Sequence, residues 1–149
     1  MTKNLDKEGL SSIVDDYQLF YVDLWGVVHN GVSLHQKAIK ALNEITKKKK
    51  DYILLTNAPR PNYAVKSFLE KLGMEKEIRD HVFTSGEAAL NYLKKNLSNK
   101  PFFHIGPPRD FDLFSNFEKR KTETIEKSDY LLCTGLFDEH DEDLKYYKD

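Results

Sequence analysis

The chain has 149 residues, the usual size of a single domain and enough to bury a hydrophobic core. Its 23 Lys and Arg residues nearly balance 24 Asp and Glu residues, and the formal net charge of −1 argues against a nucleic-acid partner and against an acidic disordered chain. One cysteine excludes an internal disulfide framework. Neither a secretory signal nor the run of about 20 apolar residues that a membrane helix needs is visible, so we expect a cytoplasmic protein with no membrane partner.

The first half of the chain alternates between predicted strands and helices. Residues 18–24 form a short aromatic and branched run, typical of a buried strand, and a glycine-containing loop follows. Ser33 and Gln36 have the spacing of a capping box, which predicts a helix starting there. A second strand is predicted over 52–55 and a second helix over 63–72.

The second half continues this alternation. A short strand is predicted over 82–83, and Ser85 is predicted to cap the helix that follows. Further strands are predicted over 102–105 and 130–133, and the tail beyond Phe137 is predicted to be helical. The alternation of strand and helix favours an α/β fold with a largely parallel sheet.

Ligands of such sheets bind at the carboxyl ends of the strands, where Asp23, Thr56 and Asn57 stand. The Asp23 carboxylate could attack phosphorus or bind Mg²⁺, or it could simply accept hydrogen bonds from the following loop. Thr56 and Asn57 could hold a phosphate together with helix N–H groups, or Asn57 could only cap a turn. The pairing of these residues on neighbouring strand ends makes a phosphate site competitive with the purely structural interpretations.

Three other residues carry weaker signals. His29 lies in the loop after the first strand and could meet a substrate, although a loop histidine without such a role is the simpler interpretation. His104 lies inside an apolar strand and is predicted to be a hydrogen-bonded core residue. Cys133, in a similar strand, is predicted to be a small buried hydrophobic residue.

The segments around the strand ends resemble two motifs of the haloacid dehalogenase (HAD) superfamily. Residues 21–31, YVDLWGVVHNG, are similar to the first motif, and residues 54–60, LLTNAPR, to the second. The branch most resembled is class IIA, the NagD-like and p-nitrophenylphosphatase-like hydrolases, and the resemblance runs from about Tyr17 onward. It implies a partial Rossmann-like HAD core over residues 1–98 and the start of an α/β cap over 99–149.

The resemblance also implies a phosphohydrolase that uses Mg²⁺ and acts on small phosphorylated metabolites. Asp23 would attack phosphorus and form an aspartyl-phosphate, which water would then hydrolyse. Mg²⁺ would bind Asp23 and the backbone carbonyl of Trp25, and Thr56 and Asn57 would hold the phosphoryl oxygens. Positioning and charge neutralisation would supply most of the catalysis.

Two features depart from the family pattern. Trp25 stands where the family has an aspartate that serves as general acid and base, and an indole cannot transfer that proton. The later lysine and Gly-Asp motifs are missing, so we expect the N-terminal half of a longer protein, with weak activity. A non-catalytic phosphate- or metabolite-binding protein and a dehalogenase-like hydrolase remain alternatives. The acidic run over 138–143 is expected to be a solvated face, and an incomplete sheet edge allows a homo-oligomer.

Overall fold

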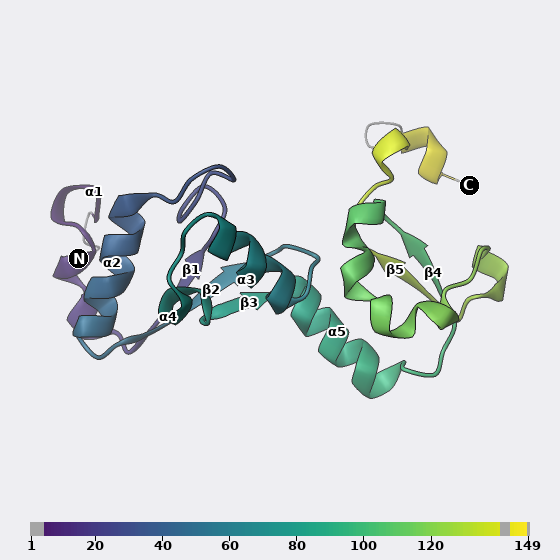
Figure 1. Cartoon of the computed structure of the whole chain (residues 1–149), viewed down its shortest axis with the longest axis horizontal. Coiled ribbons are helices and arrows are strands. Elements are labelled where there is room, and N and C mark those ends of the chain that lie inside the picture. The colour runs from purple at the N-terminus through teal and green to yellow at the C-terminus, as the bar shows by residue number, and fades with distance from the viewer. Residues whose placement is uncertain (1–4, 141–143, 149) are drawn as a thin grey trace. The chain divides into compact units, whose positions relative to one another are not determined.

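The computed structural model describes residues 5–140 and 144–148, and its helices and strands alternate through the first hundred residues (Figure 1). The alternating elements are β1 (Leu19–Asp23), α2 (Gln36–Lys47), β2 (Asp51–Thr56), α3 (Asn62–Lys71), α4 (Lys76–Arg79), β3 (Val82–Thr84) and α5 (Ser85–Asn96). The predicted α/β class with a parallel sheet is therefore confirmed.

Shorter elements precede and follow this series. Before β1 come α1 (Leu5–Glu8) and the 3₁₀ helices η1 (Leu10–Ser12) and η2 (Val14–Asp16). After α5 come β4 (Phe102–Ile105), η3 (Pro108–Leu113), η4 (Ser115–Arg120), η5 (Ile125–Lys127), β5 (Tyr130–Cys133), η6 (Asp138–His140) and η7 (Leu144–Tyr147). The predicted helical tail thus contains two short 3₁₀ turns, and the rest of the acidic run, 141–143, lies outside the described residues.

The chain forms two compact units that interleave along the sequence. The first unit comprises Met1–Thr56 and Lys66–Phe83, and the second comprises Asn57–Val65 and Thr84–Asp149. The expected division into a core over 1–98 and a cap over 99–149 refers to the domains of a complete hydrolase rather than to these two units, and it stays a prediction.

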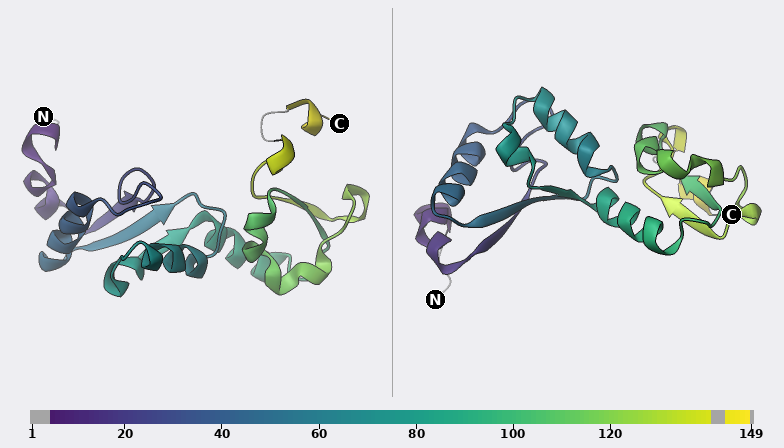
Figure 2. Two further views of the ribbon diagram at one scale, coloured as in Figure 1. Left: turned by 45° about the horizontal axis from the view of Figure 1, so that its top comes forward. Right: turned by 60° about the horizontal axis from the view of Figure 1, so that its bottom comes forward.

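A three-stranded sheet in the order β1-β2-β3 forms the centre of the first unit. β1 and β2 are parallel, with Leu19 opposite Asp51 and Asp23 opposite Leu55. One face of the sheet is buried through Tyr52 and Leu54 of β2, against which α2 packs. The right view of Figure 2 shows α2 and α3 on one side of the three strands.

The other face of this sheet is open and apolar. Leu19, Tyr21, Leu55 and Phe83 are 41 %, 67 %, 42 % and 38 % exposed, and each alternates along its strand with a more buried neighbour. The strand predicted over 18–24 is confirmed, but its burial is wrong for the four of its seven residues that are exposed, at 18, 19, 21 and 23. A continuous apolar run is buried throughout only when both faces of a parallel sheet are covered, and the described residues cover one.

The second unit contains the two-stranded parallel sheet of β4 and β5. Phe102, which is fully buried, stacks on Tyr130 and packs edge-on against Phe114. His104 is buried and hydrogen-bonded to the Thr134 hydroxyl at 2.9 Å, as predicted. Cys133, by contrast, is exposed, so its predicted burial is wrong; in a strand whose side chains alternate, it faces away from the core that Leu132 joins.

Two helices have N-caps that lie two residues and one residue away from the predicted caps, at His35 and Thr84. α2 begins at Gln36 rather than Ser33, because the Ser33 N–H donates to the Asn30 carboxamide at 2.8 Å and so belongs to the preceding turn. α5 is capped by Thr84 rather than Ser85, since the Thr84 hydroxyl accepts the Glu87 N–H at 2.9 Å.

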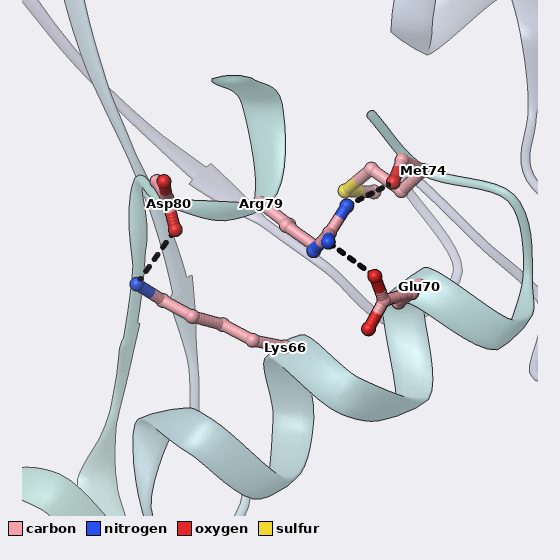
Figure 3. Close-up of polar contacts among 5 residues, drawn as sticks. All are labelled: Lys66, Glu70, Met74, Arg79 and Asp80. Carbon is pink, nitrogen blue, oxygen red and sulfur yellow. Dashed lines mark hydrogen bonds and ion pairs between the residues drawn. The ribbon is translucent and has the colours of Figure 1, made fainter. Parts of the chain in front are cut away.

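Polar contacts fix the segment that leads from α3 to β3 (Figure 3). The Arg79 guanidinium on α4 donates to the Met74 carbonyl at 2.9 Å and pairs with Glu70 on α3. Lys66 pairs with Asp80 at 3.2 Å. Exposed ion pairs contribute little energy. The part-buried Arg79–Met74 hydrogen bond joins α4 to the turn that follows α3.

Candidate functional site

The predicted site residues of the first unit come from two adjacent strand ends. Asp23 is the last residue of β1 and lies opposite Leu55 of β2, and Thr56 is the next residue of β2. Successive side chains alternate across a strand, so Asp23 and Thr56 belong to opposite faces of the same sheet edge. A ligand that contacts both would therefore bind over the edge of the sheet, at the carboxyl ends of the strands.

Asp23 is exposed, and one of its carboxylate oxygens, Oδ1, accepts the Leu24 N–H at 2.8 Å. This contact is the backbone hydrogen bond that the structural interpretation of Asp23 predicts. It orients the carboxylate, and the exposure of the side chain leaves it accessible to a solute. The two interpretations of Asp23 are therefore compatible.

The segment after β1, here called loop 24–35, folds back over itself. The Gly26 N–H donates to the His29 carbonyl at 2.8 Å, and the His35 N–H donates to the Val28 carbonyl at 2.8 Å. The Trp25 indole lies against Gly31, where a Cβ atom would come within 2.7 Å of the ring. Gly31 also has a φ of +88°, so glycine is required there on both counts. Trp25 is consequently held in place although it is 65 % exposed.

The buried side chain of His29 stabilises loop 24–35, to which His29 itself belongs. Its side chain is buried, packs edge-on against Trp25 and Phe68, and accepts the Gly31 N–H at Nδ1 over 3.0 Å. Burial lowers the pKa of His29, His35 lowers it further, and Asp23 opposes the shift. A neutral imidazole with an accepting Nδ1 suits this position, so the structural role, rather than substrate contact, describes His29.

Asn57 opens the segment 57–62, here called loop 57–62, which belongs to the second unit. The Asn57 side chain is exposed, and the Asn57 backbone carbonyl accepts a hydrogen bond from the Ser85 hydroxyl at 2.8 Å. The Asn62 carboxamide accepts the Thr84 N–H at 3.0 Å, and the Asn62 N–H donates to Glu87 at 3.0 Å. The loop is thus attached to the start of α5 at both of its ends.

Arg60, in the middle of this loop, faces the region after β4. Its guanidinium pairs with Asp112 of η3 at 3.0 Å, while its buried Nε atom makes no hydrogen bond in the described structure. Since both charged groups are partly exposed, the ion pair contributes little stability. It links loop 57–62 to η3 within the second unit.

The described residues contain no group of three or more His, Cys, Asp or Glu side chains that could enclose a metal ion. Asp23 and the Trp25 carbonyl are oxygen donors, which Mg²⁺ prefers, and this ion commonly binds one or two carboxylates together with substrate phosphate and water. The residues therefore fit part of such a site. A cavity of about 320 Å³ lies elsewhere, between η1 and α2, and none of the predicted site residues lines it.

Comparison with known proteins establishes the class. The family described as "Haloacid dehalogenase-like hydrolase" matches residues 20–118, so the chain belongs to the haloacid dehalogenase-like hydrolases. The matched region includes Asp23, Thr56 and Asn57 and extends beyond β4. The predicted superfamily is thereby confirmed.

Individual relatives are similar over most of this chain. Phosphoglycolate phosphatase 2 of Arabidopsis thaliana is 26 % identical over 97 % of the chain and 53 % of its own length. A haloacid dehalogenase-like hydrolase from Brucella suis 1330 is 32 % identical, with a TM-score of 0.74 over 87 % of this chain and 46 % of its own. The chain therefore spans about half the length of these relatives.

Two further structures share the fold at lower identity. The 4-nitrophenylphosphatase of Thermotoga maritima has a TM-score of 0.62 and 22 % identity over 81 % of this chain and 46 % of its own. The glycerol phosphate phosphatase of Mycobacterium tuberculosis, in complex with magnesium, has a TM-score of 0.61 and 20 % identity over 83 % and 38 %. These two likenesses show that the fold is shared.

The sequence did not single out the contacts between Thr84, Ser85 and loop 57–62 as part of a site. The sequence offered two signals: Ser85 was predicted to cap a helix, and Thr84 and Ser85 follow a predicted strand, at the end where ligands of parallel sheets bind. Neither signal predicts the partners of Ser85, which are 27 and 28 positions earlier in the chain. No helix among the described residues has the length and apolar character needed to cross a bilayer.

Proposed function

We propose that this chain carries the nucleophile-bearing part of a HAD-type phosphohydrolase that acts on small phosphorylated metabolites. The observation that supports it most is the pairing of β1 and β2, because it brings an exposed carboxylate, Asp23, to the same sheet edge as the hydroxyl residue Thr56. The names of two similar proteins, a phosphoglycolate phosphatase and a glycerol phosphate phosphatase, point to small phosphate monoesters as substrates.

In the proposed reaction, an Asp23 carboxylate oxygen attacks phosphorus and the bond from phosphorus to the ester oxygen breaks. The leaving alkoxide takes a proton from water, because Trp25 has none to give at neutral pH. A second water then attacks the phosphorus of the aspartyl-phosphate, which releases inorganic phosphate and restores the carboxylate. Thr56 and Asn57 hold the phosphoryl oxygens during both steps.

Asp23 and the Trp25 carbonyl would hold Mg²⁺, which would neutralise charge on the phosphoryl oxygens when bound. The chain offers one carboxylate for this purpose within the site, so the remaining ligands would come from substrate and water. Loss of a general acid typically costs about 10²–10⁴-fold in rate, so we expect turnover to be slow.

The test is hydrolysis of p-nitrophenyl phosphate with Mg²⁺ by the unmodified chain, by Asp23→Asn and by Asp51→Asn. Asparagine keeps the acceptor for the Leu24 N–H but cannot form the aspartyl-phosphate. Asp51, an exposed aspartate at the opposite end of β2, provides the matched control. We expect turnover to be abolished by Asp23→Asn and unchanged by Asp51→Asn. Equal turnover by all three chains would remove Asp23 from the mechanism.

A non-catalytic phosphate-binding protein is a second candidate, and the placement of Trp25 favours it. The indole is packed against Gly31 and His29 at the position where catalysis needs a proton donor. This candidate predicts phosphate binding that Asp23→Asn preserves, with no turnover by any chain. Halide release without Mg²⁺ would instead support the dehalogenase-like alternative.

A further inference from the structure

We propose that Ser85, at the start of α5, is a positioning residue that sets the backbone direction of loop 57–62 and thereby the proposed phosphate contact of Asn57. The inference rests on the proposed function, because it concerns the phosphate contact proposed there for Asn57. The contacts that carry it all lie within the second unit.

The Ser85 hydroxyl contacts two successive carbonyl oxygens of the loop. It lies 2.8 Å from the Asn57 carbonyl and 2.9 Å from the Ala58 carbonyl. A hydroxyl has one proton to donate, so these two contacts share it in a three-centre arrangement. The Gly86 N–H adds a second donor to the Ala58 carbonyl at 3.1 Å. Two neighbouring peptide groups are therefore oriented by one helix start.

The preceding residue, Thr84, holds the other half of the loop. Its fully buried hydroxyl donates to the Arg60 carbonyl at 2.6 Å and accepts the Glu87 N–H at 2.9 Å. The same hydroxyl thus caps α5 and binds the loop. Because α5 has 12 residues and its first turn carries partial positive charge, its N-terminus favours carbonyl oxygens that point toward it.

Close packing leaves the loop little freedom to move away. A Cβ atom at Gly86 would lie 2.5 Å from the Arg60 backbone nitrogen and oxygen, well inside van der Waals contact. The loop backbone therefore rests directly on the first turn of α5. With Thr84 fixing the Arg60 carbonyl, Ser85 is the side chain that contacts the Asn57 and Ala58 carbonyls, in the two successive peptide groups that follow Asn57.

The orientation of these peptides matters for an anion. Carbonyl oxygens carry partial negative charge and repel phosphate, whereas a peptide N–H attracts it. Since C=O and N–H point in opposite directions across a trans peptide, turning the Asn57 carbonyl toward Ser85 fixes the whole peptide plane. Without the Ser85 hydroxyl, this peptide could rotate and present its oxygen to the bound phosphate.

The test compares Ser85→Ala, Ser85→Thr and Ser128→Ala with the unmodified chain. Ser128 is the matched control, because it is also a serine of the second unit whose hydroxyl donates, in an exposed hydrogen bond, to a backbone carbonyl, that of Ile125 at 2.7 Å. Inorganic phosphate is titrated in, with Mg²⁺ present, and the amide NMR shift of Asn57 reports binding. Hydrogen exchange of the loop 57–62 amides and the urea midpoint are measured on the same samples.

We expect Ser85→Ala to weaken phosphate binding about fivefold, the loss of one hydrogen bond, and to speed exchange in loop 57–62. Ser85→Thr should restore both, and Ser128→Ala should match the unmodified chain. Equal phosphate affinity in Ser85→Ala and the unmodified chain would overturn the positioning role while leaving the proposed function intact. Absence of phosphate binding by the unmodified chain would overturn both.

Discussion

Replacing Gly86 by alanine should destabilise the second unit, although alanine normally strengthens a helix. The added Cβ would lie 2.5 Å from the nitrogen and oxygen of Arg60 and 2.6 Å from its carbonyl carbon. Backbone atoms cannot swing aside like the end of a side chain, so loop 57–62 must shift. Overpacking of this kind costs about 1–3 kcal/mol, while the gain in helix propensity is at most about 1 kcal/mol and smaller near a helix start.

We therefore expect Gly86→Ala to lower the free energy of unfolding by about 2 kcal/mol. The assay is urea denaturation followed by far-UV circular dichroism, with Gly135→Ala as the matched control. A Cβ at Gly135 would meet only Pro107, at an ordinary contact distance of 3.4 Å, so that variant should stay within about 0.5 kcal/mol of the unmodified chain. If Gly86→Ala is as stable as the control, the close approach of loop 57–62 to α5 is wrong.

Two further predictions concern stability. Burial lowers the pKa of His104, with Lys121 lowering it further and Asp110 opposing, so the unfolded chain takes up the proton first as the pH falls. The contribution of His104 to the free energy of unfolding should be fully present above pH 6.5 and should be lost as the pH falls from there toward the lowered pKa. His104→Gln should therefore flatten part of the fall of the urea midpoint with pH. An unchanged slope would contradict the assignment. Leu54 is fully buried, whereas Leu55 is 42 % exposed. In urea denaturation, Leu54→Ala should therefore lower the free energy of unfolding by about 2–5 kcal/mol and Leu55→Ala by about 1 kcal/mol or less. Equal losses would mean that the two faces of the sheet are equally covered.

The sequence predicts the strands and the strand-end residues well because both depend on local patterns. β2 lies where its apolar run predicts, and the register that places Asp23 opposite Leu55 follows from adjacent parallel strands. The roles of Asp23, Thr56, Asn57 and Trp25 in binding and catalysis stay predictions, because geometry alone does not test chemistry. The same holds for Mg²⁺ and for the small phosphorylated substrate.

Features that depend on competition or on distant contacts were not predictable in this way. Ser33 has the spacing of a helix cap, yet its N–H donates to the Asn30 side chain, which makes Ser33 part of the preceding turn. Cys133 has the surroundings of a core residue, yet the strand turns it outward. Ser85 has the composition of a cap, but its partners in loop 57–62 lie nearly thirty residues upstream, beyond the reach of any local rule.

The strand order β1-β2-β3 has a consequence for how the chain acquires its structure during synthesis. Among the described residues, each later strand of this sheet pairs with the strand made just before it, so β1, β2 and β3 form their mutual hydrogen bonds in chain order. Short sequence separations between partners favour rapid folding. As the polypeptide leaves the ribosome, the sheet can therefore grow one strand at a time, and the sheet edge that bears Asp23 and Thr56 is formed as soon as β2 has emerged and paired.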